Sequence, residues 1–80
     1  MYFVYIIKSI NINRYYIGST ENVEKRLSYH NSGKVRSTKA FRPWELVHTE
    51  PYDDRTDAVK REKQIKSYKG GMAFKKLLKL

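Results

Sequence analysis

Apolar and polar positions alternate in the first part of the chain, and this pattern predicts two neighbouring strands. Residues 2–8 alternate and are rich in aromatic and β-branched side chains. Residues 14–19 repeat the pattern, and the asparagines between the two runs favour the turn of a β-hairpin. The register of this hairpin stays open, because a shift of one residue decides whether Tyr5 and Tyr16 share a face of the sheet.

The apolar spacing changes to that of a helix after the second strand. The positions of Val23, Leu27 and His30 predict an amphipathic helix over about residues 22–31. Gly33 is a normal helix-ending residue. The side chains that could cap the start of this helix belong to Ser19, Thr20 and Asn22.

The second half of the chain predicts one further strand and two further helices. A basic loop over residues 34–42 precedes a strand over residues 44–52, which has a proline near each end. A helix over about residues 56–69 follows, with capping side chains before it and two glycines after it. Residues 73–80 predict a short basic helix. The order of elements is therefore β-β-α-β-α-α, and the length predicts one domain over residues 1–80.

The chain is strongly basic, and most of its excess charge lies toward the C-terminal end. Seventeen basic residues against eight acidic ones give a net charge of +9, and residues 60–80 hold eight basic residues and one acidic residue. This charge favours a polyanionic partner, either a nucleic acid or an anionic membrane surface. Seven Tyr, three Phe and one Trp offer surfaces on which bases can stack, and this favours nucleic acid.

Composition also excludes several classes of protein. The absence of cysteine excludes disulfides and a thiolate zinc site. The longest apolar run, residues 3–7, is too short to span a bilayer, so we expect a soluble cytoplasmic protein with no membrane partner. The sequence has no glycine loop that would cradle a phosphate, no zinc-ligand spacing and no Ser–His–Asp arrangement that spacing supports.

Glu62 is the acidic residue whose position is most informative. It falls on a helical stripe with Ala58 and Ile65 that should face the core, inside the most basic part of the chain. It could be the ion-pair partner of Arg26 or Lys66. It could also be a ligand of Mg²⁺, which often takes one or two carboxylates and completes its shell with water and phosphate oxygens.

Four residues of the N-terminal part could take part in chemistry. Tyr5 and Tyr16 are either ordinary strand aromatics or phenols that need a nearby cation to act as bases, since a phenol titrates near ~10. Arg26 is either a surface charge or a fork that fits two phosphate oxygens. His30 is either a half-buried structural histidine or a group that accepts a proton from water or polarises a tyrosine hydroxyl. His48 has no obvious partner, and we expect it to be structural.

Three sequence blocks, in this order, resemble the GIY-YIG nuclease superfamily, specifically its short stand-alone bacterial members. Tyr16-Ile17-Gly18 matches the second element of the family's signature, and Phe3-Val4-Tyr5 stands for the first, with Phe in place of Gly. Residues 19–27, followed by residues 30–33, resemble the family's helix-one motif. Residues 61–66 resemble the family's metal-binding helix, so the likeness covers nearly the whole chain.

The resemblance implies an α+β fold in which a three-stranded antiparallel sheet carries helices. It implies that one divalent ion, Mg²⁺ or Mn²⁺, binds at Glu62 and that Arg26 contacts the scissile phosphate. It also implies that Tyr5, Tyr16 and His30 surround the attacking water, in enzymes that hydrolyse DNA phosphodiesters by in-line attack. Besides the Phe3 substitution, the sequence lacks the Asn that larger members often carry in a late helix.

The resulting hypothesis is a metal-dependent DNA endonuclease, of the kind used in DNA repair or recombination. Without a separate DNA-reading domain, we expect it to select branched, nicked or single-stranded DNA, or to be recruited by a protein partner. The alternatives are a non-catalytic nucleic-acid-binding module on the same fold and a basic protein-interaction domain. The residues expected to contact nucleic acid are Gly18, Lys34, Arg36, Lys39 and Lys66.

Overall fold

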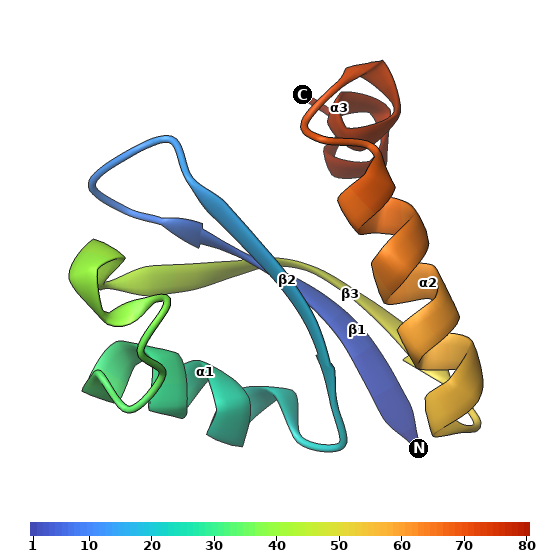
Figure 1. The fold of residues 1–80 in the computed structure, drawn as a ribbon, viewed down its shortest axis with the longest axis horizontal. Helices are drawn as coiled ribbons and strands as arrows, with labels where there is room; N and C mark the ends of the chain where they lie inside the picture. The colour runs from blue at the N-terminus through green and yellow to red at the C-terminus, as the bar shows by residue number, and fades with distance from the viewer.

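The fold is built on a three-stranded antiparallel sheet, described here by a computed structural model of residues 1–80. The strand order is β2-β1-β3, so the first strand is central and the other two are edges. The elements in chain order are β1 (Tyr2–Ser9), β2 (Tyr15–Thr20), α1 (Val23–Ser32), the 3₁₀ helix η1 (Lys39–Phe41), β3 (Trp44–Tyr52), α2 (Arg55–Ser67) and α3 (Met72–Leu78). The predicted fold class and element order are confirmed (Figure 1).

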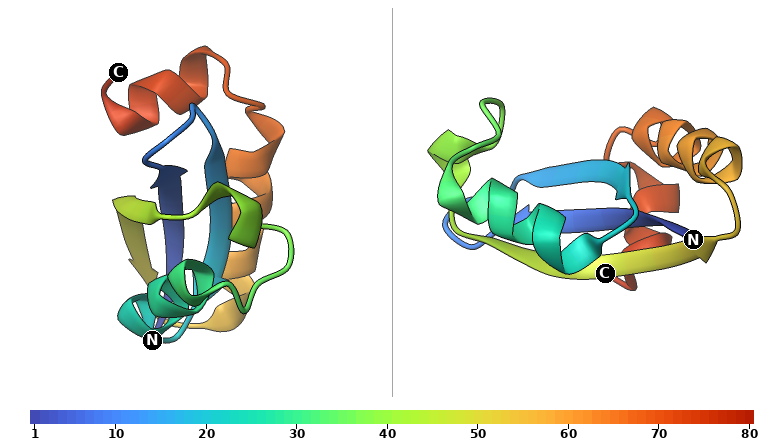
Figure 2. Two further views of the ribbon diagram at one scale, coloured as in Figure 1. Left: turned by 90° about the vertical axis from the view of Figure 1, so that its left-hand side faces the viewer. Right: turned by 90° about the horizontal axis from the view of Figure 1, so that it is seen from below.

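The central strand β1 is buried on both faces, because helices cover the sheet from both sides. In the face-on view of the sheet in Figure 2, α1 lies in front and α2 behind. Val4 and Ile6 point to the side of α2 and α3, where they form a cluster with Ala58, Ile65 and Phe74. Tyr5 and Ile7 of β1 point to the other side of the sheet. Beneath α1 they form a second cluster with Trp44 of β3.

The register of the β1–β2 hairpin, which the sequence leaves open, places both tyrosines on the α1 side. Tyr5 pairs with Gly18 and Ile7 pairs with Tyr16, so the two phenols are diagonal neighbours rather than direct partners. Residues on one strand that are two apart share a face, and the ring centroids of Tyr5 and Tyr16 are 6.3 Å apart. The hairpin therefore supplies two neighbouring phenols to one face.

Local capping residues fix where the two long helices begin and end. The Asn22 side chain accepts a hydrogen bond from the Lys25 amide at 3.0 Å, and Asp54 does the same for α2. Gly33 ends α1 in the left-handed conformation, with φ +83°. Of the three predicted cap candidates, only Asn22 caps α1. The Ser19 hydroxyl instead donates across to α2.

A polar cluster around Glu50 connects β3 to α2. The carboxylate accepts hydrogen bonds from Arg61 Nε at 2.8 Å and Nη2 at 3.2 Å, and from the Tyr52 hydroxyl at 2.8 Å. His48 Nε2 lies 2.8 Å from the same carboxylate, so Glu50 is the partner of His48 that the sequence does not reveal. The two residues are two apart on a strand and hence share a face.

None of the helices combines the length and the apolar character needed to cross a membrane.

Candidate active site

Three elements bring four of the expected site residues together on the α1 side of the sheet. Tyr5 comes from β1, Tyr16 from β2, and Arg26 and His30 from α1. The Tyr5 hydroxyl lies 2.9 Å from His30 Nε2, and the rings of Tyr16 and His30 have centroids 4.8 Å apart. His30 is the buried residue of α1, because it points from the helix onto the sheet.

Gly18 makes room for the Tyr5 phenol. A Cβ atom at Gly18 would lie 2.6 Å from the Tyr5 oxygen and 2.8 Å from Cζ, too close for either atom to stay in place. Because Gly18 sits opposite Tyr5 on the neighbouring strand, the phenol can lie across its bare backbone. The glycine therefore has a packing reason at this position, independent of any contact with nucleic acid.

Each ring nitrogen of His30 has a hydroxyl partner. Its Nδ1 lies 2.8 Å from the hydroxyl of Thr38, and that hydroxyl also lies 3.3 Å from the Val35 carbonyl as a donor. This contact favours the tautomer in which Thr38 accepts from Nδ1–H and Nε2 accepts from the Tyr5 hydroxyl. Thr38 is itself held, because it is buried and its carbonyl accepts from the Trp44 indole at 2.9 Å.

Burial and one guanidinium set the protonation states of this group. Burial lowers the pKa of His30 to about 4, and the Arg26 charge adds to the effect, so the imidazole is neutral at pH 7. Burial raises the pKa of Tyr5 to about 12, although Arg26 acts in the opposite direction. Interaction with the Tyr5 hydroxyl raises the pKa of Arg26, which therefore stays charged.

Glu62 of α2 contacts Ser19 of the edge strand β2, and its charge acts on Tyr5. Both of its oxygens are occupied: the Ser19 hydroxyl donates to Oε1 at 2.7 Å, and Lys66 Nζ donates to Oε2 at 2.7 Å. Of the two ion-pair partners that the sequence suggested, the structure has Lys66. Burial is the main cause that raises the pKa of Tyr5, and the nearby charge of Glu62 contributes in the same direction.

The donor atoms near Glu62 fit a magnesium-type ion better than a zinc ion. No three side chains of His, Cys, Asp or Glu gather at one point, so the protein supplies no multidentate metal cage. Glu62 offers a carboxylate and Ser19 a hydroxyl, which are the hard oxygen donors that Mg²⁺ and Mn²⁺ prefer. One carboxylate leaves most of the coordination shell to water and to phosphate oxygens.

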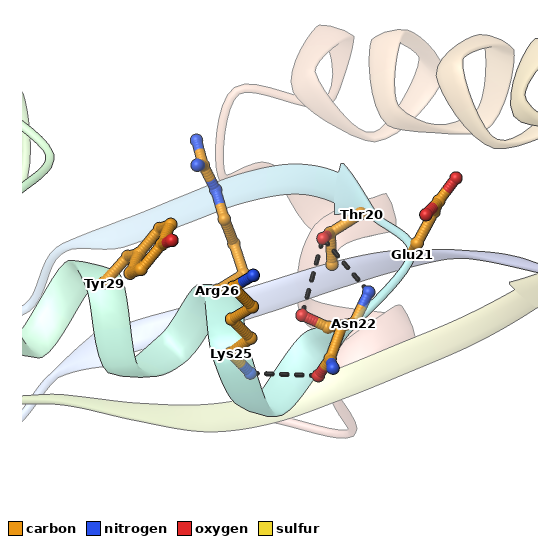
Figure 3. A pocket seen from close by; sticks show the side chains of 6 residues that line it. All are labelled: Thr20, Glu21, Asn22, Lys25, Arg26 and Tyr29. Atoms are coloured by element: carbon orange, nitrogen blue, oxygen red, sulfur yellow. Dashed lines mark hydrogen bonds between the residues drawn. The ribbon is translucent and has the colours of Figure 1, made fainter.

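A pocket of about 430 Å³ opens beside Arg26, where the end of β2 and the turn after it meet α1. Figure 3 shows the Arg26 side chain between the Tyr29 ring and Thr20. The expected nucleic-acid contacts Lys34, Arg36 and Lys39 are exposed in the segment that follows α1. Lys66 is exposed over about half of its side chain even though it pairs with Glu62.

Two residues of this site have roles that the sequence pattern does not predict. The pattern predicts Ser19 only as a helix cap, and it does not single out Thr38. Both act across elements that are distant in sequence, Ser19 on a residue 43 positions later and Thr38 on one eight positions earlier. Alternation along β2 does indicate the direction of Ser19. Because neighbouring residues of a strand point to opposite faces, the Ser19 side chain points away from the face of Gly18 and toward α2.

The profile of the GIY-YIG catalytic domain matches residues 1–75. The chain belongs to the GIY-YIG family. A UPF0213 protein of Staphylococcus epidermidis is 44% identical over 68 residues, which cover 84% of this chain and 82% of that protein. A UPF0213 protein of Syntrophus aciditrophicus is 47% identical over 66 residues, covering 80% and 75%. The resemblance inferred from the three sequence blocks is thus confirmed.

A solved GIY-YIG relative has the same fold. The solution NMR structure of a UPF0213 protein from Bacillus halodurans superposes with a TM-score of 0.50 and 30% sequence identity, covering 82% of this chain and 70% of that one. Membership of the family places the chain among nucleases, whose substrate is DNA and which typically use a divalent metal ion.

Proposed function

We propose that this GIY-YIG protein is a metal-dependent endonuclease that hydrolyses DNA phosphodiester bonds at the Tyr5–His30 pair. The observation that carries the proposal is the 2.9 Å hydrogen bond from the Tyr5 hydroxyl to a neutral, buried imidazole beside Arg26. A phenol whose own proton already points to a base can accept a proton from water without becoming a free phenolate.

The pKa values require the two proton transfers to be coupled. The pKa of the Tyr5 phenol is about 12 and the pKa of the His30 imidazole is about 4, so both groups are neutral at pH 7. The reaction therefore starts from neither a phenolate nor an imidazolium. As the attacking water bonds to phosphorus, its proton moves to the Tyr5 oxygen and the Tyr5 proton moves to His30 Nε2. The bond from phosphorus to the leaving sugar oxygen breaks with its electron pair, and that oxygen takes a proton from solvent. Phosphate bound at Arg26 would offset the charge that lowers the pKa of His30, which makes this transfer easier.

Arg26 and Tyr16 complete the arrangement around the phosphate. The Arg26 guanidinium stays charged and can hold two non-bridging oxygens while negative charge develops on them. Tyr16, whose ring packs against His30, would hold the water through its hydroxyl. Phe3, which replaces the Gly of the first signature element, lines a separate surface depression with Val23 and Leu46.

Glu62 would hold the divalent ion, with Ser19 fixing the orientation of its carboxylate. The ion supplies positive charge for the phosphate oxygens and the leaving oxygen. Since a single carboxylate binds such an ion weakly, we expect the free protein to have low affinity for Mg²⁺ and the DNA complex to have higher affinity. We further propose selection by DNA structure rather than base sequence.

A cleavage assay tests the proposal. Plasmid, linear, nicked and branched DNA are incubated with Mg²⁺ or Mn²⁺ and the wild-type protein, which should cleave at least one of them. Tyr5→Phe removes one hydroxyl and keeps the ring, so we expect the rate to fall by on the order of 10²-fold or more. The fold should persist with a lower melting temperature, because the buried His30 Nε2 loses its hydrogen-bond partner. Glu45→Gln, an exposed position on β3, serves as the control and should cleave like wild type.

One observation favours a second candidate function, a nucleic-acid-binding module without turnover. Lys66 occupies the Glu62 oxygen that a metal ion would need. Glu62→Gln separates the two candidates, because an amide can still accept from Ser19 while binding a divalent ion poorly. Lys66 is largely exposed, so the loss of this pair should cost about 1 kcal/mol of folding free energy or less.

If the protein is a nuclease, Glu62→Gln should abolish cleavage with both ions, while DNA binding in the absence of metal should persist or tighten. Cleavage by the variant at the wild-type rate would reject Glu62 as the metal ligand. An absence of metal-dependent cleavage in the wild type, with DNA binding retained, would leave the binding module as the function.

A further inference from the structure

The pocket beside Arg26 contains an aromatic side chain that the fold does not use. Tyr29 lies on the same face of α1 as Lys25 and Arg26, one turn further along the helix. It packs against neither hydrophobic cluster of the protein, and its hydroxyl forms no hydrogen bond within the chain. The ring is half-buried at the wall of the pocket (Figure 3).

Two ammonium groups flank this ring. Lys25 Nζ lies 5.9 Å and Lys34 Nζ lies 5.1 Å from its centroid. Both lysines are exposed and have long, flexible stems. A ligand can therefore displace the ammonium groups from the ring while their charge stays nearby. An aromatic ring with cations close to it can hold a base by stacking and the phosphates next to that base by charge.

The simpler explanation is that Tyr29 covers the aliphatic stems of the two lysines. That explanation accounts for the cation–π contacts, but not for the pocket between the ring and Arg26, which is also lined by the polar side chains of Thr20 and Asn22. The only acidic side chain at the pocket, Glu21, is directed away from Arg26 and Tyr29 (Figure 3). The part of the pocket near the ring is thus positive and open to an anionic strand.

We propose that Tyr29 is a stacking site for an unpaired base of a DNA strand, one nucleotide from the phosphate that Arg26 binds. Lys25 and Lys34 would contact the phosphates on either side of that base. A paired base inside a duplex cannot present its face to a protein ring, so the site would favour single-stranded, flapped or otherwise unpaired DNA. This inference rests on the proposed function for the position of the phosphate and adds the substrate class.

The test measures binding without cleavage. A short single-stranded oligonucleotide carries 2-aminopurine, a base whose fluorescence is quenched when it stacks, and EDTA is present throughout. Its affinity and quenching are compared with those of the matching duplex for wild type, Tyr29→Phe and Tyr29→Leu. Tyr68→Leu, the same change at the residue that follows the end of α2, is the control.

Wild type and Tyr29→Phe should quench the probe alike, because both keep the ring. Tyr29→Leu should bind the single strand on the order of tenfold more weakly and lose the quenching, while its affinity for the duplex stays within about twofold. Tyr68→Leu should match wild type. Thermal melts check folding, and Tyr29→Met replaces the Leu variant if that variant is unstable.

Equal binding and quenching by Tyr29→Leu and wild type would overturn the proposal, as would an equal loss of affinity for single strand and duplex. These outcomes are independent of the nuclease assay. A protein that cleaves DNA but shows no effect at Tyr29 loses only the stacking site. A protein that quenches through Tyr29 but never cleaves keeps the stacking site and loses the nuclease function.

Discussion

Each ring nitrogen of the His30 imidazole has a hydroxyl partner, Thr38 at Nδ1 and Tyr5 at Nε2. In the tautomer that the Thr38–Val35 hydrogen bond favours, Thr38 accepts from Nδ1–H and the Tyr5 hydroxyl donates to Nε2. The direction of the Tyr5 proton, and with it the lone pair that faces the substrate, depends on a threonine hydroxyl that never touches DNA. Thr38 is therefore a positioning residue in the proposed reaction.

Thr38→Val tests this role with a side chain of the same shape. The change leaves Nδ1–H buried without an acceptor, so the proton should move to Nε2, where the Tyr5 oxygen can accept it. Imidazole ¹⁵N chemical shifts would report that change of tautomer directly. Cleavage should fall on the order of 10²-fold, and Thr38→Ser, which keeps the hydroxyl, should restore both the tautomer and most of the rate. An unchanged tautomer in Thr38→Val would refute the assignment.

Single residues differ in how far their sequence context reveals them. Tyr5, Tyr16, Arg26 and His30 lie within contiguous motifs that single them out in the sequence. Their meeting on one side of the sheet depends on the hairpin register and on the side where α1 packs, which the periods leave open. Thr38 lies in a segment without periodicity, and its hydroxyl finds His30 only once that segment folds back against α1. No local pattern encodes such a contact.

The secondary-structure elements were predictable because local chemistry defines their ends. Each strand and helix begins and ends within two residues of its predicted bounds, and the strand Trp44–Tyr52 has the predicted bounds. Asn22 and Asp54 cap the helix starts. The exception is η1, a single 3₁₀ turn in the segment predicted as a basic loop, which is too short to show a period.

The contact between β3 and α2 through Glu50 makes stability depend on pH. Burial alone would raise the pKa of Glu50, but hydrogen bonds from Arg61, His48 and Tyr52 outweigh it and lower the pKa to about 2. A carboxyl whose pKa is lowered in the folded state stabilises the protein at pH values above its pKa in the unfolded chain, which is about 4.5. That contribution is lost as the pH falls from about 4.5 to 2.

Glu50→Gln should therefore unfold more easily than wild type at pH 7, by about 3 kcal/mol at most, and the difference should disappear near pH 2. Urea unfolding across this pH range measures the difference, with Glu45→Gln as the control on the same strand. Buried His30, whose pKa is lowered to about 4, also costs both proteins stability as the pH falls from about 6.5 to 4. That loss cancels between them. A constant difference at all pH values would rule out the Glu50 ionisation as its cause.

At the scale of the molecule, the sheet separates two groups of basic residues. α1 and the segment after it lie on one side, with Arg26, Lys34 and Lys39, whereas α3 lies on the other side with Lys75 and Lys76 (Figure 2). The sequence shows the excess of charge but not this division, because the side of the sheet on which each helix packs follows from tertiary contacts. A ligand centred on Arg26 meets the first group before the second.

Salt dependence can tell which group contacts DNA. With an oligonucleotide of roughly eight nucleotides, the logarithm of the affinity should fall linearly with the logarithm of the salt concentration, by about 0.7 for each phosphate contact on a single strand. Replacing Lys34 and Lys39 with Ala should make this slope less steep, by the contribution of about two phosphate contacts. The same replacement of Lys75 and Lys76 makes an equal change in net charge, and it should leave the slope nearly unchanged with the short strand and lower it only with longer DNA. Equal effects of both pairs on the short strand would place α3 at the binding site, contrary to a strand centred on Arg26. A wild-type affinity independent of salt would show that phosphate contacts do not drive binding.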